Sequence, residues 1–197
     1  MSGWQGLRLA DADAALWSHW LDAAEADALF AELGRAIAWE THRIRLFGRE
    51  HDSPRLSCWI GDPLARYRYS GAEFVPHPWP PALQAMRGRL QAEGIGRFNS
   101  VLLNRYRGGG DYMGWHSDDE PELGPTPVIA SLSLGAARRF LLRRRDDPAR
   151  KAEYLLGHGD LLVMAGQTQR FYQHALPKMA RVQGERINLT FRWITPR

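Results

Sequence analysis

A series of short apolar or alternating runs in the second half of the chain constrains the fold most. Seven such runs are separated by glycine, proline and charged residues: 98–107, 128–135, 138–145, 153–156, 160–164, 169–176 and 186–194. Seven strands within about 100 residues are typical of a β-sandwich or a β-barrel. None of the runs approaches the roughly 20 apolar residues of a membrane-spanning helix, so we expect no membrane span.

The first half of the chain carries helical patterns instead. Apolar side chains recur every three or four residues over 11–39, which predicts one or two amphipathic helices beginning at Asp11 or Asp13. A further helix is predicted over 80–93, because a Pro-Pro pair suits its first turn and Gly94 ends it. Residues 43–62 follow no period, and we expect them to be extended and irregular. The chain is therefore predicted to be α+β, with the N-terminal helices packed on the sheet.

The composition is that of one globular domain covering residues 1–197. The chain is 44% hydrophobic and 24% charged, and it is long enough for one well-buried core but short for two. Cys58 is its single cysteine, which excludes an internal disulfide, and the N-terminus lacks the pattern of a secretory signal. We therefore expect a cytoplasmic, intracellular protein. The net charge of +4 agrees with an anionic partner without requiring one.

Polarity alternates without exception along the last predicted strand. Four polar side chains fall on one face: Arg186, Asn188, Thr190 and Arg192. A sheet with one face in water would give the same alternation. Two arginines on a single strand face also suit a ligand with two carboxylates, because a guanidinium can give a carboxylate two parallel hydrogen bonds. On an earlier predicted strand, Asn104 and Tyr106 share a face and could add neutral hydrogen bonds to the same ligand.

Three residues have the composition of a metal site. His116 and Asp118 are two positions apart, and His174 follows 58 residues after His116. This is the ligand set of the facial triad that holds non-haem Fe(II), with coordination positions left open. A zinc hydrolase would use similar ligands but would give no reason for the two arginines. The remaining histidines are more typical of surface or packing positions: His19, His42, His51, His77 and His158.

These motifs together resemble the AlkB-like Fe(II)- and 2-oxoglutarate-dependent dioxygenases. The resemblance rests on NRY at 104–106, HSDDE at 116–120, His174 and RINLTFR at 186–192, and it covers about residues 43–195. It implies a double-stranded β-helix, or jelly roll, with the catalytic core in 98–197 and helices plus nucleotide-recognition segments in 1–97. The implied iron ligands are His116, Asp118 and His174. The implied 2-oxoglutarate contacts are Asn104, Tyr106, Arg186, Asn188 and Arg192, with the two arginines on its carboxylates.

The resemblance is nearest to the branch that repairs alkylated nucleic acid bases. It implies an oxidative demethylase of DNA, or of RNA, that uses Fe(II), 2-oxoglutarate and O2. Decarboxylation of 2-oxoglutarate would be coupled to hydroxylation of an N-methyl group, and the product would release formaldehyde and the unmodified base. We expect such a protein to act as a monomer on nucleic acid with methylated bases.

An enzyme that acts on a single base must remove it from the stack and hold it between flat side chains. In the duplex-acting members of the family, the segment corresponding to YRYSG at 67–71 lines the pocket for the damaged base, which makes Tyr67 and Tyr69 candidates. Three residues around the metal motif are candidates for the other wall: Trp115, Asp119 and Glu120. The two carboxylates suit a cationic methylated base. Ordinary packing of the tyrosines and loop hydrogen bonds of the acids would explain the same residues.

Two basic segments suggest contacts with a nucleic acid backbone. Phe47 lies in a Leu-Phe-Gly turn among Arg43, Arg45 and Arg49, which resembles a hairpin that inserts an apolar wedge into the base stack. Burial of Phe47 in the core is the alternative. A second cluster of seven basic residues lies between 138 and 151, and it could hold a second strand or form an ordinary solvated face.

Two other classes of function remain open at this stage. One is a 2-oxoglutarate oxygenase acting on a protein or a small molecule. The other is a non-catalytic nucleic-acid-binding jelly roll, although a binding module would have no use for three metal ligands together with two arginines. The basic surface, Phe47 and the paired tyrosines favour the nucleic acid enzyme.

Overall fold

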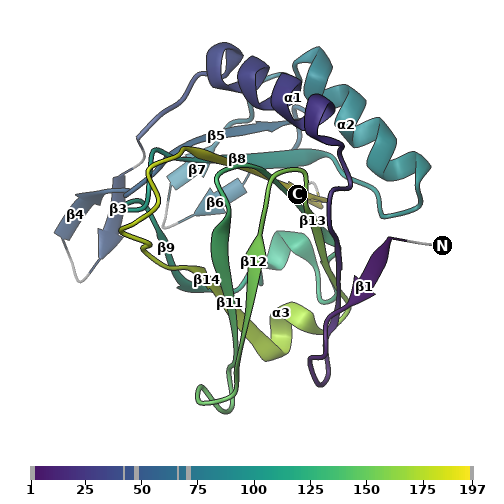
Figure 1. Ribbon diagram of the computed structural model, residues 1–197, viewed down its shortest axis with the longest axis vertical. Helices are drawn as coiled ribbons and strands as arrows, with labels where there is room; N and C mark the ends of the chain where they lie inside the picture. Colours follow the sequence, from purple (N-terminus) through teal and green to yellow (C-terminus); the bar gives the residue numbers. More distant parts are fainter. Residues whose placement is uncertain (1–2, 42, 47–48, 66, 70–71, 196–197) are drawn as a thin grey trace.

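The computed structural model describes residues 3–41, 43–46, 49–65, 67–69 and 72–195, and it contains two main antiparallel sheets (Figure 1). The larger has seven strands in the order β1 (Trp4–Gly6), β2 (Asp13–Trp17), β13 (Leu161–Ala165), β10 (Ile129–Gly135), β15 (Arg186–Arg192), β8 (Ser100–Tyr106) and β5 (Leu56–Gly61). The smaller has four, in the order β12 (Lys151–Leu156), β11 (Arg138–Arg144), β14 (Tyr172–Leu176) and β9 (Met113–His116). Two hairpins pair β3 (Arg43–Leu46) with β4 (Arg49–Asp52) and β6 (Tyr67–Tyr69) with β7 (Ala72–Phe74).

The double-sheet architecture predicted for the second half of the chain is confirmed. Each of the seven predicted runs contains a strand. The pattern missed β9, because this strand has four residues, includes Gly114 and pairs with β14 through an irregular register. It also missed the helical turn α3 (Thr168–Phe171) at the start of the 169–176 run, where the Thr168 hydroxyl lies 2.6 Å from the Ala165 carbonyl oxygen.

The helical prediction over 11–39 is wrong for its first part. Residues Asp13–Trp17 form β2, which pairs with β1 and β13 and buries Ala14 and Leu16 on alternate positions. Helix α1 begins only at Ala23 and ends at Ala36. Its N-cap is Asp22, not Asp11 or Asp13: the Asp22 carboxylate accepts from the backbone N–H of Glu25 at 2.9 Å, and the Glu25 side chain accepts from the backbone N–H of Asp22.

The second helix forms as the sequence predicts. Helix α2 spans Pro81–Ala92, with proline in its first turn. Gly94 follows in the left-handed region with φ +73°, and its N–H donates to the carbonyl of Gln91. Along the part of the chain that is described, no helix combines the length and hydropathy needed to cross a bilayer.

Apolar packing holds α1 and α2 against one side of the larger sheet. Leu29 and Leu33 of α1 and Leu83 and Leu90 of α2 belong to the same buried cluster as strand residues such as Leu189. In Figure 1 both helices lie on one side of β5 and β8, with β11 and β12 on the other. The helices therefore cover the outer face of the larger sheet and leave its inner face toward the smaller one.

The inner face is where the polar residues of β15 lie. All seven residues of this strand are buried, because Ile187, Leu189 and Phe191 pack in the cluster shared with the helices while the alternate positions point between the sheets. The interpretation of this alternation as a sheet with one face in water is therefore excluded. A second apolar cluster that includes Leu142, Leu162 and Met164 fills another part of the space between the sheets.

We expect Asp22→Ala to lower the free energy of unfolding by about 1 kcal/mol, because the Glu25 N–H loses its capping acceptor. Urea denaturation followed by circular dichroism measures this change. Glu32→Ala, at an exposed position on the same helix, is the control and should change the free energy by less than about 0.5 kcal/mol. Equal losses in both variants would contradict the capping role.

Candidate active site

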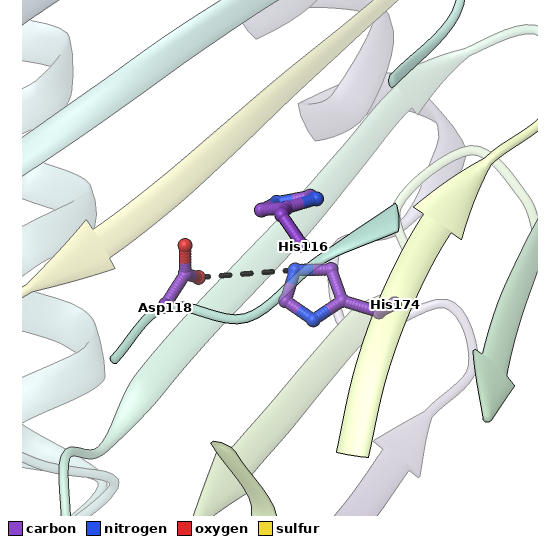
Figure 2. A group of neighbouring side chains, drawn as sticks. All are labelled: His116, Asp118 and His174. Carbon is purple, nitrogen blue, oxygen red and sulfur yellow. Dashed lines mark ion pairs between the residues drawn. The ribbon is translucent and has the colours of Figure 1, made fainter. Parts of the chain in front are cut away.

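The smaller sheet and the segment after β9 bring His116, Asp118 and His174 together. His116 ends β9 and is the paired neighbour of His174 on β14, while Asp118 lies two residues beyond β9. One potential ligand atom from each residue lies within 4.8 Å of those of the other two. Figure 2 shows the Asp118 carboxylate and the His174 ring turned toward each other, with the His116 ring beside them. The three residues form a compact donor set of two imidazoles and one carboxylate, which suits a divalent cation.

The protonation states of these groups suit a metal. Burial and the nearby His116 lower the pKa of His174 to about 3, although Asp118 acts in the opposite direction. Burial acts to raise the pKa of Asp118, but Arg192 and the two histidines outweigh it and lower this pKa to about 2. Near neutral pH the His174 ring is therefore uncharged and Asp118 is ionised, so their 3.9 Å contact is not a true ion pair. Neutral imidazole and ionised carboxylate are the forms that ligate metals.

Hydrogen bonds hold Asp118 and His116 in place, and a ring contact packs against His174. Arg192 Nη2 donates to Asp118 Oδ1 at 2.8 Å, and the backbone N–H of Asp118 donates to Gln169 Oε1 at 2.9 Å. His116 Nδ1 lies 2.9 Å from the carbonyl oxygen of Gly114. If Nδ1 donates there, the lone pair of Nε2 is left for a metal. The Phe140 ring stacks on His174, with 5.3 Å between ring centroids.

All eight residues predicted to bind iron or 2-oxoglutarate line one cavity between the sheets. The cavity contains about 480 Å³ of empty space, part of it open to solvent. These lining residues are Asn104, Tyr106, His116, Asp118, His174, Arg186, Asn188 and Arg192. The sequence therefore identified a set of side chains that the fold brings together from β8, β9, β14, β15 and the segment after β9.

Arg186 gives the cavity the character of an anion site. Its side chain is 1% exposed, and its Nη2 donates to Ser133 Oγ at 2.9 Å and to Asn188 Oδ1 at 2.6 Å. Its Nε has no hydrogen-bond partner, and among the described residues no carboxylate pairs with it. Burial lowers the pKa of Arg186 to about 10, so the group stays charged near neutral pH. A buried cation without a carboxylate fits an anionic ligand.

Several residues that support the site were not predicted. Ser131 and Ser133 alternate along β10 and bond to Asn188 and Arg186, and that alternation could have identified them. The buried Arg55, just before β5, donates from its Nε to Asn104 Oδ1 at 2.7 Å. The sequence could not predict this contact, because the two residues are 49 positions apart.

The predicted basic cluster over 138–151 does not form a continuous cationic face. Arg138 is fully buried and donates to the carbonyl oxygens of Gly108, Asp111 and Pro177. Arg144 is also buried and pairs with Asp11 and Asp146 at 2.8 and 2.7 Å. The prediction is therefore wrong for these two arginines, which alternate on β11 with more exposed neighbours and face inward.

The structure brings none of the described side chains predicted to contact a base into the cavity, although Trp115 and Asp119 adjoin His116 and Asp118 in the chain. Trp115 lies under the guanidinium of Arg143, 4.3 Å from it, and Asp119 pairs with Arg145 at 2.6 Å. Trp115, Asp119 and Glu120 do not belong to the described residues that line the cavity. Phe47 lies outside the described residues. Tyr67 and Tyr69 are the first and last residues of β6. Their contact with a base stays a prediction.

We expect Arg192→Met to destabilise the metal-free protein by about 3–5 kcal/mol, because it leaves the buried Asp118 carboxylate without its closest cation. Urea denaturation of the metal-stripped protein measures this loss. Arg143→Met is the control, since the half-buried Arg143 bonds to the neutral amide of Gln173 and should cost at most about 2 kcal/mol. A loss below about 1 kcal/mol for Arg192→Met would contradict the importance of this pair.

Comparison with known proteins agrees with this geometry. The family model of the 2OG-Fe(II) oxygenase superfamily matches residues 13–192. The chain is 41% identical over 183 residues to the DNA oxidative demethylase ALKBH2 of Mus musculus, covering 88% of this chain and 77% of that protein. It is 37% identical over 190 residues to the alpha-ketoglutarate-dependent dioxygenase alkB homolog 3 of Homo sapiens, covering 92% of this chain and 66% of that protein.

A solved structure supports the same fold. The structure of OsALKBH1 superposes with a TM-score of 0.67 over 96% of this chain and 99% of that chain, at 18% identity. At this identity the likeness concerns the fold alone, and it is consistent with the predicted jelly roll. From the family match and the two relatives, the chain belongs to the AlkB-like group of the 2OG-Fe(II) oxygenase superfamily, dioxygenases that use Fe(II), 2-oxoglutarate and O2.

Proposed function

We propose that this protein removes methyl groups from alkylated bases in DNA by oxidation. The observation that carries the proposal is the shared cavity, in which the donor set of His116, Asp118 and His174 opens onto the same space as the unpaired cation of Arg186. DNA as the substrate is supported by the mouse relative, which is named a DNA oxidative demethylase and is 41% identical.

His116, Asp118 and His174 are the residues that would hold iron. Arg186 would bind one carboxylate of 2-oxoglutarate, because it is a buried cation whose described partners are neutral. Asn104, Tyr106 and Asn188 line the same space and would add neutral hydrogen bonds. Arg192 would serve the other carboxylate while it keeps Asp118 ionised.

When bound together, iron and 2-oxoglutarate supply the oxidising power from O2 that hydroxylates the carbon of an N-methyl group, with loss of CO2 and formation of succinate. The hydroxymethyl product then separates into formaldehyde and the unmodified base. The chain itself needs no nucleophile for this reaction. Its residues bind and orient the reactants and keep them away from bulk water.

Base recognition would involve Tyr67, Tyr69, Trp115, Asp119 and Glu120. Asp119 is held by Arg145, but both side chains are about half exposed. Exposed pairs of this kind contribute only about 0–1 kcal/mol, so a cationic base could replace Arg145 as the partner of Asp119.

The expectations of a single domain, a monomer, a cytoplasmic location and a wedge at Phe47 remain predictions.

The direct test is formaldehyde release from three methylated substrates: a DNA oligonucleotide, an RNA oligonucleotide and a peptide. We expect Fe(II)- and 2-oxoglutarate-dependent release from the DNA, and none from the peptide. His174→Ala should abolish release because the donor set loses one member, whereas His77→Ala, at an exposed position, should not. Turnover with the peptide alone would favour an oxygenase of protein substrates, and binding of DNA without any turnover would favour a non-catalytic module.

Arg186→Met tests the anion site separately. We expect the Kd for 2-oxoglutarate to rise at least about 30-fold, because a buried carboxylate that loses its charged partner costs roughly 2–5 kcal/mol. Calorimetry with Mn(II) in place of iron measures this affinity without turnover. Arg139→Met, which removes an exposed arginine paired with Glu153, should leave the Kd unchanged. The same Kd in wild type and Arg186→Met would refute the assignment.

A further inference from the structure

The short helix α3 precedes the strand of one metal donor and contacts the segment of another. It spans Thr168–Phe171, directly before β14, the strand that carries His174 (Figure 1). The sequence pattern predicts a strand from residue 169 onward, yet the chain makes a helical turn first. Gln169 belongs to this turn and reaches the segment of Asp118, 51 residues away in sequence.

Among the described residues, the one strong hydrogen bond of the Gln169 side chain is to a residue of the donor set. Its side chain is 3% exposed, and its Oε1 accepts from the backbone N–H of Asp118 at 2.9 Å. In the described part of the chain, the partner of its Nε2 is the thioether of Met164 at 3.6 Å. Because a buried backbone N–H requires an acceptor, this bond fixes the peptide unit that leads into Asp118.

The helix that carries Gln169 is itself anchored to the larger sheet. The hydroxyl of Thr168 accepts from the backbone N–H of Asp13 on β2 at 3.0 Å, and Thr168 is 1% exposed. A further bond connects the segment of Asp118 to the start of β14, because Ser117 Oγ donates to the carbonyl oxygen of Tyr172 at 2.9 Å. The segment carrying His116 and Asp118 is therefore tied to the segment carrying His174 from outside the donor set.

We propose that Gln169 is a positioning residue for the metal site. It holds the Asp118 backbone so that the carboxylate faces His174 before a metal binds. This inference rests on the proposed function, because it takes Asp118 and His174 as iron ligands. Groups that orient ligands in this way typically contribute about 10–100-fold to metal affinity. Arg192 orients the carboxylate of Asp118, and Gln169 orients its main chain, so the two act on different atoms of the same residue.

The test is the affinity of the metal-stripped full chain for Mn(II), measured by calorimetry. Gln169→Met keeps an unbranched side chain of similar length beside Met164 but removes the amide acceptor, and we expect it to weaken Mn(II) binding about 10–100-fold. Gln169→Glu keeps an acceptor at the same position and adds a negative charge, so it should not weaken Mn(II) binding. Absorption by Co(II) in the same variants reports whether the coordination of the metal has changed.

The control is Gln167→Met, an exposed position just before the same helix, which should leave Mn(II) affinity unchanged. A merely structural role predicts that Gln169→Met lowers Tm while Mn(II) affinity and the Co(II) spectrum of the folded protein stay the same, and that result would overturn the inference. If Gln169→Met does not fold, Gln169→Asn, whose amide is one carbon shorter, must show the same loss of affinity. A wild-type chain that binds no Mn(II) would instead contradict the proposed function.

Discussion

Burial of charge between the two sheets is the constraint on which the rest of the structure depends. β15 places Arg186 and Arg192 in the interior, and Asp118 is the one carboxylate among the described residues that line the cavity. Arg192 is paired with Asp118, whereas Arg186 has only neutral partners. A buried uncompensated cation destabilises a protein unless a ligand offsets it. Apolar clusters on the outer face of the larger sheet and in another part of the space between the sheets stabilise the fold that holds this charge.

The same two sheets decide how precisely the donor set is built. His116 and His174 come from paired strands of the smaller sheet, so their separation follows from strand pairing. Asp118 lies beyond the end of β9, where no ladder fixes it, and side chains replace the missing ladder: Arg192 from the larger sheet, and Gln169 from α3. Asp118, the donor that lies outside regular structure, is thus held by hydrogen bonds with side chains of two other elements.

Sequence reasoning succeeded where function leaves a local signature and failed where it depends on distant contacts. The alternation along β15 and the spacing of His116 and Asp118 predicted part of the cavity lining, because strand geometry and ligand chemistry are both local. The family resemblance supplied the assignment of the full set to iron and 2-oxoglutarate. Residues 11–21 were predicted to be helical, but pairing of β2 with β1 and β13 overrides that local pattern over Asp13–Trp17. The bonds of Arg55 and Gln169 cross 49 and 51 residues, so no local pattern could reveal them. On β11, burial alternates as expected for a strand, but the sequence analysis treated its run of arginines as one basic cluster and so missed that Arg138 and Arg144 are buried.

The charges in the cavity also determine how each proposed ligand would affect the binding of the other. Arg186 and Arg192 outnumber Asp118, and fully buried Arg138 adds a positive charge near Tyr106, so the metal-free cavity is electropositive. A divalent cation alone would increase that excess, while a dicarboxylate would reduce it. Each of the two proposed ligands would therefore improve the electrostatic environment of the other, and their binding would be thermodynamically coupled by linkage. This coupling would be larger in the low dielectric of the buried site than at the protein surface. Burial of Arg186 would therefore strengthen the linkage between metal binding and 2-oxoglutarate binding.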